Sequence, residues 1–419
     1  MKMLFGVLAG ILFATTVPAD DVQLQAGVAQ ADITPATFMT MYGYANRRCG
    51  PANGTHDPLH AKALVLSTGD SRMAIVTLDL GNIVAPNLGP KVAGALGIPV
   101  LLLAASHTHS APQVAPGSAE ATELENKIFD AVERASKSMF PARLGIGRGS
   151  LQLGYNRLLP RDDGRSRALF DNLERVPYGP VDPEYVLLSV DDMAGATRAL
   201  LVHYACHAVV LGPTSCKYSA DYPGAMQAKV ESQMKGTQCM FVQGGAGDIN
   251  PLFEGRTSKE DEDFATMQKM GELLADDVLR SAKNIHPTSP MRYPIQAIQK
   301  NMTFSDRWDK EKSLNVGVTT VLINREIGIA TAPGEPMHKL QTMWKKEAPV
   351  RYPLFYGYTY SSEGEWAGYI PDLRTAAHGG YGADVTTRIE IGAGEQIIQQ
   401  QLINAYKLLE MWRDKPGRP

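Results

Sequence analysis

The sequence predicts a single α/β domain with a mixed β-sheet flanked by helices and an active site in the loops at the carboxyl ends of strands. Short apolar and β-branched runs end in polar or glycine-rich loops. Between them lie stretches whose apolar residues recur at helical spacing. No internal repeat and no proline- or serine-rich linker divides the chain of 419 residues, of which 44% are hydrophobic and 20% charged.

The first half of the chain supplies a strand that leads into the candidate site. Its expected elements are, in order, strands at 62–66 and 73–78 joined by a turn at 67–71, a strand at 100–105 and a helix through 124–139. The run 100–105 is continuously apolar, which is typical of a buried strand, and polar residues follow it directly. Its carboxyl end therefore opens into a loop.

The second half supplies two more strands with polar loops behind them. Its expected elements are a hairpin of strands at 199–205 and 186–190, a strand at 238–242, a helix through 264–278, a strand pair at 316–323 and 326–331, and a helix at 397–409. Glycines at 244–247 follow the strand at 238–242, and charged loops at 161–167 and 253–259 are expected on the surface.

The charge balance argues against a nucleic-acid partner. The formal net charge is −3, the sequence pI is near 6.3, and no cluster of lysines and arginines alternates with aromatic residues. We expect a small-molecule or lipid-like acyl substrate instead. The sequence leaves the oligomeric state open.

Residues 1–19 resemble a cleaved export signal. Lys2 precedes an apolar run at 3–13, and the stretch Val17-Pro18-Ala19 suits a signal peptidase. A membrane anchor is the other reading, but this run is about half of the roughly 20 residues that a spanning helix needs. We expect residues 20–419 to be a soluble periplasmic or secreted protein without a transmembrane segment.

The chain has four cysteines, and the periplasm or the outside of the cell is an oxidising compartment in which disulfides can form. They are Cys49, Cys206, Cys216 and Cys239, and the sequence does not choose among their three possible pairings. Cys206 lies beside His207 and could be a thiolate ligand. A buried small hydrophobe or a disulfide partner is the reading we favour for Cys206.

The strongest local sign of chemistry is His107-Thr108-His109. On an extended segment, residues two apart project to the same side, so both imidazoles can reach one metal ion. The hydroxyls of Ser106, Thr108 and Ser110 could fix the histidine tautomers. A His-x-His pair alone is more often a surface or hydrogen-bonded feature, so further ligands are needed.

His203 and His207 compete to be the third ligand. They are four residues apart, as in helical metal sites, but the surrounding sequence is too apolar and β-rich for a helix. We favour His207, because it ends the run next to the turn at Gly212-Pro213. His203 lies in mid-strand and is expected to be a core histidine.

The chain resembles the neutral/alkaline ceramidases and their shorter relatives with the same amidase domain. The matching pieces are Ala-Asp-Ile-Thr-Pro at 31–35, His-Ala-Lys-Ala-Leu at 60–64, Ser-His-Thr-His-Ser-Ala-Pro at 106–112, Ala-Cys-His at 205–207, Ser-Ala-Asp-Tyr-Pro-Gly at 219–224, Gly-Asp-Ile-Asn-Pro at 247–251 and Pro-Gly-Glu at 333–335. They follow the family's order over nearly the whole chain after residue 19.

The resemblance implies a zinc hydrolase and a set of site residues. The implied zinc ligands are His107, His109, His207, Glu335 and Tyr369, and Arg157 and Tyr381 are implied near the substrate carbonyl. Histidines with one carboxylate suit zinc, which lowers the pKa of bound water to about 7, and Arg157 and Tyr381 are suitable donors to an oxyanion. The plainer readings are a helix first-turn carboxylate for Glu335, a surface ion pair for Arg157 and packing for Tyr381.

One departure from the family bears on mechanism. Asn250 stands where ceramidases have a serine, and it follows Asp248 in the glycine-rich loop. Asparagine is no hydroxyl nucleophile but can hydrogen-bond a substrate oxygen, so we predict attack by metal-bound water, with Asp248 and Asn250 in the site. The chain is also expected to lack the family's C-terminal β-sandwich. An N-acyl amide is the expected substrate; an ester, a lactone, a non-lipid amide or a non-catalytic metal-binding role are the alternatives.

Overall fold

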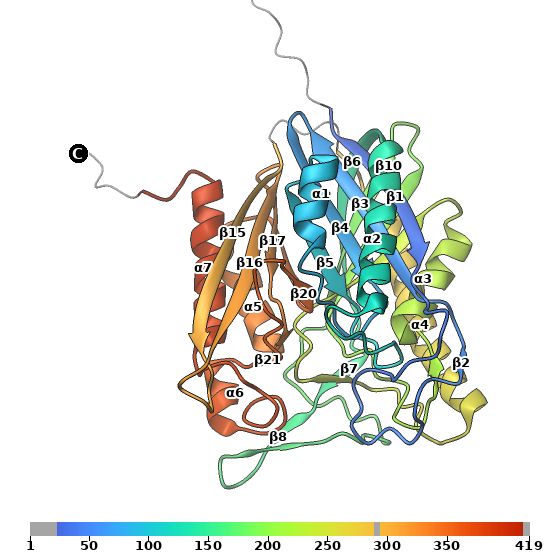
Figure 1. The fold of residues 1–419 in the computed structure, drawn as a ribbon, viewed down its shortest axis with the longest axis vertical. Helices are drawn as coiled ribbons and strands as arrows, with labels where there is room; N and C mark the ends of the chain where they lie inside the picture. The colour runs from blue at the N-terminus through green and yellow to red at the C-terminus, as the bar shows by residue number, and fades with distance from the viewer. Residues whose placement is uncertain (1–22, 289–293, 414–419) are drawn as a thin grey trace, which may run out of the picture.

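Nine strands form the largest sheet in the computed structural model, which describes residues 23–288 and 294–413 (Figure 1). Their order across the sheet is β13 (Gln238–Gln243), β11 (Thr197–Tyr204), β10 (Glu184–Asp192), β6 (Phe140–Ser150), β1 (Gln25–Asp32), β3 (His60–Thr68), β4 (Ser71–Leu78), β5 (Val100–Ala105) and β20 (Thr359–Tyr360). The pairs β4–β5 and β11–β13 are parallel and the others antiparallel. The predicted mixed sheet is confirmed.

Twist brings the two ends of this sheet together. Counted through the pairings, β5 and β11 run in opposite directions, yet the loops that follow them meet: the Gln243 side chain donates to Ser106 O at 3.1 Å. Neighbouring strands rotate by roughly 20–25° each, which accumulates over the intervening strands. β13 accordingly contacts β5 and β4 although five strands separate β13 from β4 in the order. The carboxyl ends of β5, β11 and β13 therefore face one region.

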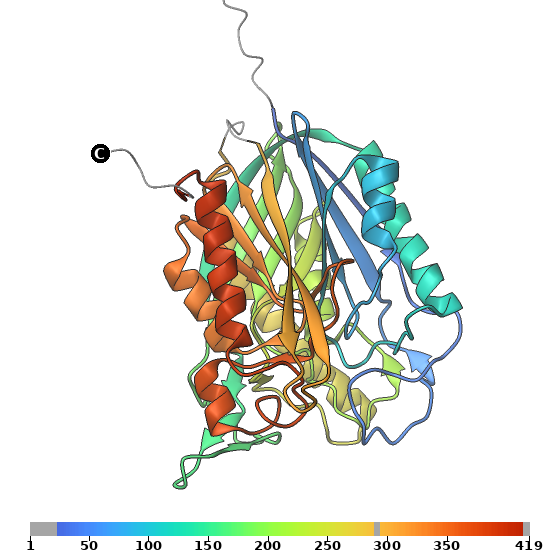
Figure 2. The same ribbon diagram turned by 60° about the vertical axis from the view of Figure 1, so that its left-hand side comes forward.

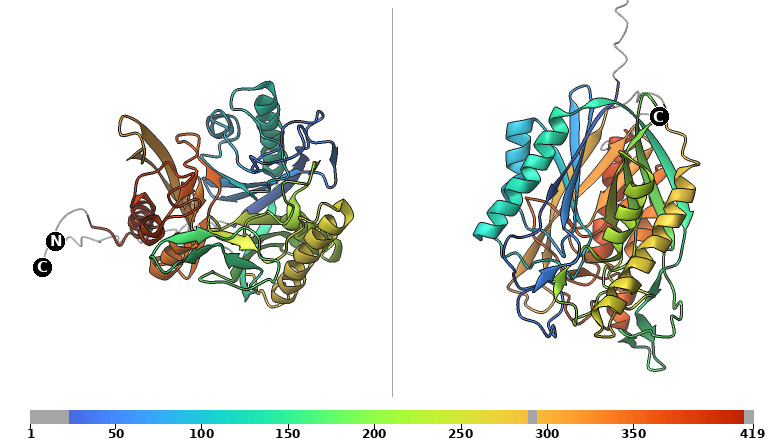
Figure 3. Two further views of the ribbon diagram at one scale, coloured as in Figure 1. Left: turned by 90° about the horizontal axis from the view of Figure 1, so that it is seen from below. Right: turned by 90° about the vertical axis from the view of Figure 1, so that its right-hand side faces the viewer.

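Two pairs of helices cover one face of the large sheet, as the right-hand view of Figure 3 shows. They are α1 (Leu88–Leu96) with α2 (Ala119–Lys137), and α3 (Asp221–Gln233) with α4 (Glu260–Ala282). Apolar residues of α2 such as Ile128 pack on β1 and β3, whereas α3 packs on β13, and those of α4 such as Leu274 share a core with α3, β10, β11 and β13. This is the helical periodicity expected from the sequence.

A second sheet covers the opposite face (Figures 1 and 2). It consists of β15 (Gln296–Ser305), β16 (Ser313–Ile323), β17 (Ile327–Thr331) and β19 (Tyr352–Tyr356). Val321, Ile329 and Leu354 join side chains of the large sheet in one core, while α5 (His338–Glu347) and α7 (Ala393–Leu408) pack on the outer side. The α/β class is confirmed, but on this face a sheet stands between the large sheet and the helices.

Most of the elements expected from the sequence are present, but several long ones were missed, among them β6 and α3. The strand β6 carries glycines at 145, 147 and 149, which weaken a strand pattern. They are needed because a β-carbon at Gly145 or Gly147 would collide with Ile285, and one at Gly149 with Tyr185. The helix α3 was missed because Pro223 and Gly224 in its first turn read as a loop.

Short elements gather below the large sheet, around the lower loops in Figure 1. They are β2 (Gly54–Thr55) with β12 (Lys217–Tyr218), β7 (Gly154–Asn156) with β14 (Ile249–Pro251), β8 (Leu158–Pro160) with β9 (Ser166–Ala168), β18 (Glu335–Pro336) with β21 (Tyr369–Ile370), and α6 (Leu373–His378). These pairings fix loops from distant parts of the chain against each other.

The predicted export signal at 1–19 lies outside the described residues. Within 23–288 and 294–413, no helix is long and apolar enough to cross a membrane.

Candidate metal centre

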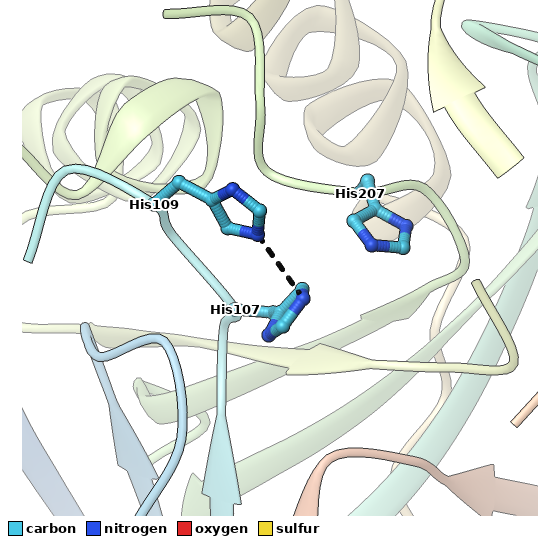
Figure 4. Close-up of side chains that lie close together, drawn as sticks. All are labelled: His107, His109 and His207. Atoms are coloured by element: carbon cyan, nitrogen blue, oxygen red, sulfur yellow. Dashed lines mark hydrogen bonds between the residues drawn. The ribbon is translucent and has the colours of Figure 1, made fainter. Parts of the chain in front are cut away.

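Three histidines from two strand ends converge on one point (Figure 4). His107 and His109 follow β5, and His207 follows β11. One ring nitrogen of each lies within 4.8 Å of the others, and Nε2 of His109 is 3.3 Å from Nε2 of His107. His107 and His207 are fully buried. The histidine cluster predicted from the sequence is therefore present in space.

Backbone carbonyls orient two of these rings. His107 Nδ1 lies 2.6 Å from Gly81 O, and His207 Nδ1 lies 2.6 Å from Ala246 O. A carbonyl oxygen only accepts, so Nδ1 is the protonated nitrogen and Nε2 keeps a free lone pair. Both free lone pairs belong to the nitrogens that face the cluster, which is the tautomer a metal ligand requires.

The expected hydroxyl partners of the histidines were wrong. The Thr108 hydroxyl donates to Ser219 O at 2.8 Å, and the hydroxyls of Ser106 and Ser110 have no partner among the described residues. Backbone carbonyls of neighbouring loops bind the rings of His107 and His207 instead, because these rings pack against backbone and not against the hydroxyl side chains that flank them in sequence.

Glu335 brings a carboxylate to the same point. Its Oε2 lies 3.2 Å from His107 Nε2 and 3.3 Å from His207 Nε2. Neither Glu335 Oε2 nor His207 Nε2 makes a hydrogen bond of acceptable geometry within the described chain, although both atoms are buried. Ligand atoms held about 2.0–2.1 Å from a tetrahedral zinc lie roughly 3.3 Å apart. The spacing and the orphaned atoms both fit a bound metal ion.

The protonation states also suit a cation. Burial lowers the pKa of His207 to about 4, against the opposing effect of Glu335. Burial also lowers the pKa of His109 well below its usual value. For Glu335, burial raises the pKa, but His107 and His207 outweigh it and hold the pKa well below the usual range. Neutral imidazoles and an ionised carboxylate are the forms that bind metals.

Arg157 and two tyrosines lie beside the cluster. The pairing of β18 with β21 sets Tyr369 opposite Glu335. Arg157 donates through Nη2 to Tyr369 Oη at 3.0 Å, and its guanidinium carbon lies 5.2 Å from the centre of the Tyr381 ring. Through Nη1 it donates to Asn250 Oδ1 at 3.0 Å. Three residues predicted for the site thus surround the buried guanidinium of a fourth, Arg157.

Asp248 points its side chain away from Arg157 and the histidine cluster. Its main-chain oxygen accepts from Arg157 N at 2.9 Å, but its carboxylate binds His338, with Oδ2 at 2.6 Å from Nδ1 and Oδ1 at 2.8 Å from the main-chain N–H. Asn156 donates to the same carboxylate at 2.8 Å. The Asp248 side chain therefore supports the start of α5, on the far side of Arg157 from the histidines.

His203 is the core histidine that the sequence indicates. It lies within β11, is 1% exposed, and its Nε2 is 2.7 Å from Phe355 O in the second sheet. Since it bridges the two sheets, it is held away from the metal cluster.

Sequence reasoning missed an aromatic wall around the histidines. The Tyr358 ring lies 4.4 Å from the His107 ring, and its buried hydroxyl has no partner among the described residues. The Tyr44 ring lies 4.8 Å from His109. Tyr42 meets His107 and His109 edge-on, each at 5.6 Å between centroids. No local motif marks these tyrosines, because they approach from separate loops.

Tyr42 and Tyr44 belong to a strap, residues 42–49, that crosses the cluster. Gly43 has φ of 96°, and a β-carbon there would lie 2.3 Å from the His109 ring, so only glycine fits. Arg47 donates to His109 O at 2.6 Å and to Ser215 O at 2.5 Å. Because it binds both sides, Arg47 fastens the strap to the metal loops.

A disulfide ends the strap. Cys49 is bonded to Cys216, which joins it to the loop beyond His207. Cys206 and Cys239 are free and buried. Cys206 is thus a small core residue, as favoured above, and its Sγ is in hydrogen-bond range only of His207 O, at 3.9 Å, among the described residues.

Comparisons with known sequences agree with these features. A family model described as neutral/alkaline non-lysosomal ceramidase, N-terminal, matches residues 24–290. Neutral ceramidase of Pseudomonas aeruginosa is 29% identical over 276 residues, which cover 58% of this chain and 40% of that protein. Neutral ceramidase B of Dictyostelium discoideum is 26% identical over 277 residues, covering 57% and 37%. The match thus spans about two fifths of these relatives' length.

Solved structures extend the likeness in fold to the rest of the chain. The crystal structure of neutral ceramidase from Pseudomonas aeruginosa has a TM-score of 0.76 at 17% identity, covering 96% of this chain and 76% of that one. A ceramidase complexed with C2 has a TM-score of 0.74 at 17% identity, covering 95% and 77%. The family match covers His107, His109, His207 and Arg157, whereas Glu335 lies outside it. By the match over 24–290, this chain belongs to the neutral/alkaline non-lysosomal ceramidase family.

Proposed function

We propose that this protein is an exported zinc hydrolase that cleaves an N-acyl amide bond with water as the nucleophile. The observation that carries the proposal is the convergence of buried, unpaired ligand atoms from His207 and Glu335 on His107, directly beside Arg157. Catalytic zinc sites combine histidines and a carboxylate in this way. When bound, zinc activates a water molecule at neutral pH and polarises a carbonyl.

The proposed ligand set has a core and two further members. His107, His207 and Glu335 form the core, because their ligand atoms already have the spacing of a shared ion. His109 and Tyr369 are the other two. A catalytic zinc has at most about five neighbours and keeps one position for water. At most one of His109 and Tyr369 therefore binds together with the core.

Arg157 is the proposed donor to the oxyanion. Its two terminal nitrogens are held by Asn250, Gly247 O and Tyr369, whereas its buried Nε has no partner within the described chain. Burial lowers the pKa of Arg157, but the neighbouring Tyr369 raises it above the usual value, so the group stays charged. A fixed charge with one free N–H suits the negative oxygen of a tetrahedral intermediate. Tyr381 is the second proposed donor.

Asn250 and Asp248 take supporting parts. Asn250 offers no hydroxyl, and its Oδ1 accepts from Arg157, so it holds the guanidinium rather than attacking substrate. Asp248 holds the main chain of Arg157 through its own carbonyl oxygen. The residues present therefore support attack by water and give no support to an acyl-enzyme on residue 250.

Substrate and location rest on two further observations. The relatives are named neutral ceramidases, so ceramide is the first N-acyl amide to test, and esters and lactones are the alternatives at the same site. The Cys49–Cys216 disulfide supports export through the predicted signal at 1–19, because such bonds persist in oxidising compartments.

The test is a turnover assay on zinc-loaded protein with short-chain ceramides, other N-acyl amides, esters and lactones. We expect amide hydrolysis, and we expect Arg157→Ala to lower kcat by about 10²–10³ with zinc content unchanged. Samples quenched during turnover should show no acyl mass adduct. A trapped adduct, or full activity of Arg157→Ala, would refute the mechanism; absence of hydrolysis across all four classes would refute the function.

A further inference from the structure

A cavity of about 380 Å³ lies beside the segments that carry Asn156 and Asp248. Its lining comes from the β8–β9 hairpin, from the start of α5, from α6 and from the Asp248 side chain, and none of the three clustered histidines takes part. Asn156 lines it, whereas the next residue, Arg157, turns its side chain toward the metal centre. The cavity and the metal centre therefore lie back to back across β7.

One buried polar group of the cavity is a histidine with one nitrogen that makes no hydrogen bond among the described residues. His338 is 7% exposed and lines the cavity. Its Nδ1 is bound to Asp248, whose carboxylate also binds Asn156 and the His338 main chain. Nε2 of His338 has no hydrogen-bond partner in the described part of the chain. Burial lowers the pKa of His338, but Asp248 outweighs it and raises the pKa, which favours the form of the ring with a proton on Nε2.

Two cations without carboxylate partners complete the lining. Lys339 and Arg374 both line the cavity, and neither forms an ion pair with any residue in 23–288 or 294–413. The acidic residues are Asp248, which is committed to His338, and Asp372, whose two oxygens accept from Thr375 at 3.2 and 2.5 Å. Lys339 and Arg374 thus lie near two carboxylates that are already hydrogen-bonded, and neither carboxylate forms an ion pair with them among the described residues.

We infer that this cavity is a binding site for a phosphate group, separate from the metal centre. The donors would be Nε2 of His338, Nζ of Lys339 and the guanidinium of Arg374, which offer charge-assisted bonds from several directions. Several oxygens on one tetrahedral group match these donors better than a flat carboxylate does.

The volume admits more than a bare phosphate ion. Small-molecule sites commonly measure roughly 300–1,000 Å³, so a phosphate monoester of modest size would fit. Apolar residues share the lining with these polar groups, among them Leu158, Pro160 and Val181. Inorganic phosphate and the headgroup of a phosphorylated lipid share the recognised chemistry, and experiment separates them.

The experiment is calorimetric titration of the zinc-loaded full chain with inorganic phosphate, with dihexanoyl phosphatidic acid below its micelle concentration, and with acetate. We expect saturable binding of at least one phosphate ligand, at least tenfold tighter than acetate. The double variant Lys339→Ala/Arg374→Ala should weaken it at least tenfold. Lys346→Ala, on the exposed side of the same helix, is the matched control and should bind like the unmodified protein.

Each outcome decides the proposal without any turnover measurement. Absence of saturable phosphate binding, or acetate bound as tightly, would overturn it. Unchanged binding in the double variant would also overturn it and would locate the phosphate elsewhere, the zinc ion included. Thermal unfolding and zinc content of the variants, expected to be unchanged, separate lost binding from lost fold. Failure here leaves the proposed hydrolase untouched, and failure of the hydrolase leaves this site untouched.

Discussion

The two walls of the metal centre are built in different ways. On one wall, His107 and His207 follow β5 and β11, which lie near opposite edges of the large sheet, and backbone carbonyls fix both rings. On the other wall, the strap at 42–49 contains no strand or helix and is fastened by Arg47 and the Cys49–Cys216 bond. The sheet therefore orients the metal ligands, whereas a few side chains hold the strap over them. Damage to each wall should have different consequences.

The largest effect should come from the sheet wall. We expect His207→Ala to lose zinc and activity together, because it removes a core ligand whose ring is already oriented by Ala246 O. Elemental analysis of the purified variant measures this directly.

His203→Ala is the matched control for that experiment. It removes a buried histidine from the same strand and leaves Phe355 O without its partner, which should cost about 1–3 kcal/mol of stability. Zinc content should remain near that of the unmodified protein. A folded His207→Ala variant with full zinc occupancy would show that the metal is held elsewhere.

Substitutions that loosen the strap should have an intermediate effect on zinc binding. We expect Arg47→Ala to weaken zinc affinity by about 10–100-fold, because Arg47 holds the main chain of His109 without being a ligand. Competition against a chromophoric chelator measures the affinity. The double variant Cys49→Ser/Cys216→Ser should shift it in the same direction, since the strap then loses its covalent end.

Arg48→Ala tests whether the effect belongs to the strap contact. Arg48 is the exposed neighbour of Arg47, so its removal changes the charge of the strap by the same amount without touching His109. Its zinc affinity should match the unmodified protein. Equal losses in Arg47→Ala and Arg48→Ala would mean that net charge, and not the contact, controls binding.

The same division explains what the sequence could predict. His107, His109 and His207 follow apolar runs, so strand periodicity and a motif were enough to find them. Glu335 and Tyr369 are brought in by the two-residue strands β18 and β21, which have no periodicity, and only the family resemblance indicated them.

The strap and the cavity could not be predicted from the sequence. Tyr44 and Tyr358 reach the cluster from loops, and nothing local distinguishes them from packing tyrosines. The second sheet had the same difficulty: the strands at 316–323 and 326–331 were found, but their position over the large sheet depends on contacts between distant segments. Local sequence patterns indicate where a strand lies and which of its residues are buried. Which distant segments pack together is seen only in the folded structure.

The smallest effect on the centre itself should come from Asp221, which braces the loop beyond His207. Its carboxylate accepts from Val210 N at 3.3 Å, Leu211 N at 3.0 Å and Tyr222 N at 2.7 Å. Burial raises the pKa of Asp221 to about 6, and the three main-chain donors only partly offset this. Between the unfolded value of about 3.9 and the folded value, the folded state binds more protons than the unfolded state, so this group makes stability fall as pH rises from about 4 to about 6.

Asp221→Asn should remove that pH-dependent component, because the amide does not ionise. Measured by denaturant unfolding, the free energy of the unmodified protein minus that of Asp221→Asn should fall by on the order of 1–3 kcal/mol between pH 4 and pH 6 and stay level above it. Zinc content should be unchanged in both proteins at neutral pH, since Asp221 touches no proposed ligand. A difference that rises over this interval would mean that the folded protein favours the ionised carboxylate, and that the three main-chain donors outweigh burial in holding this part of the sheet wall.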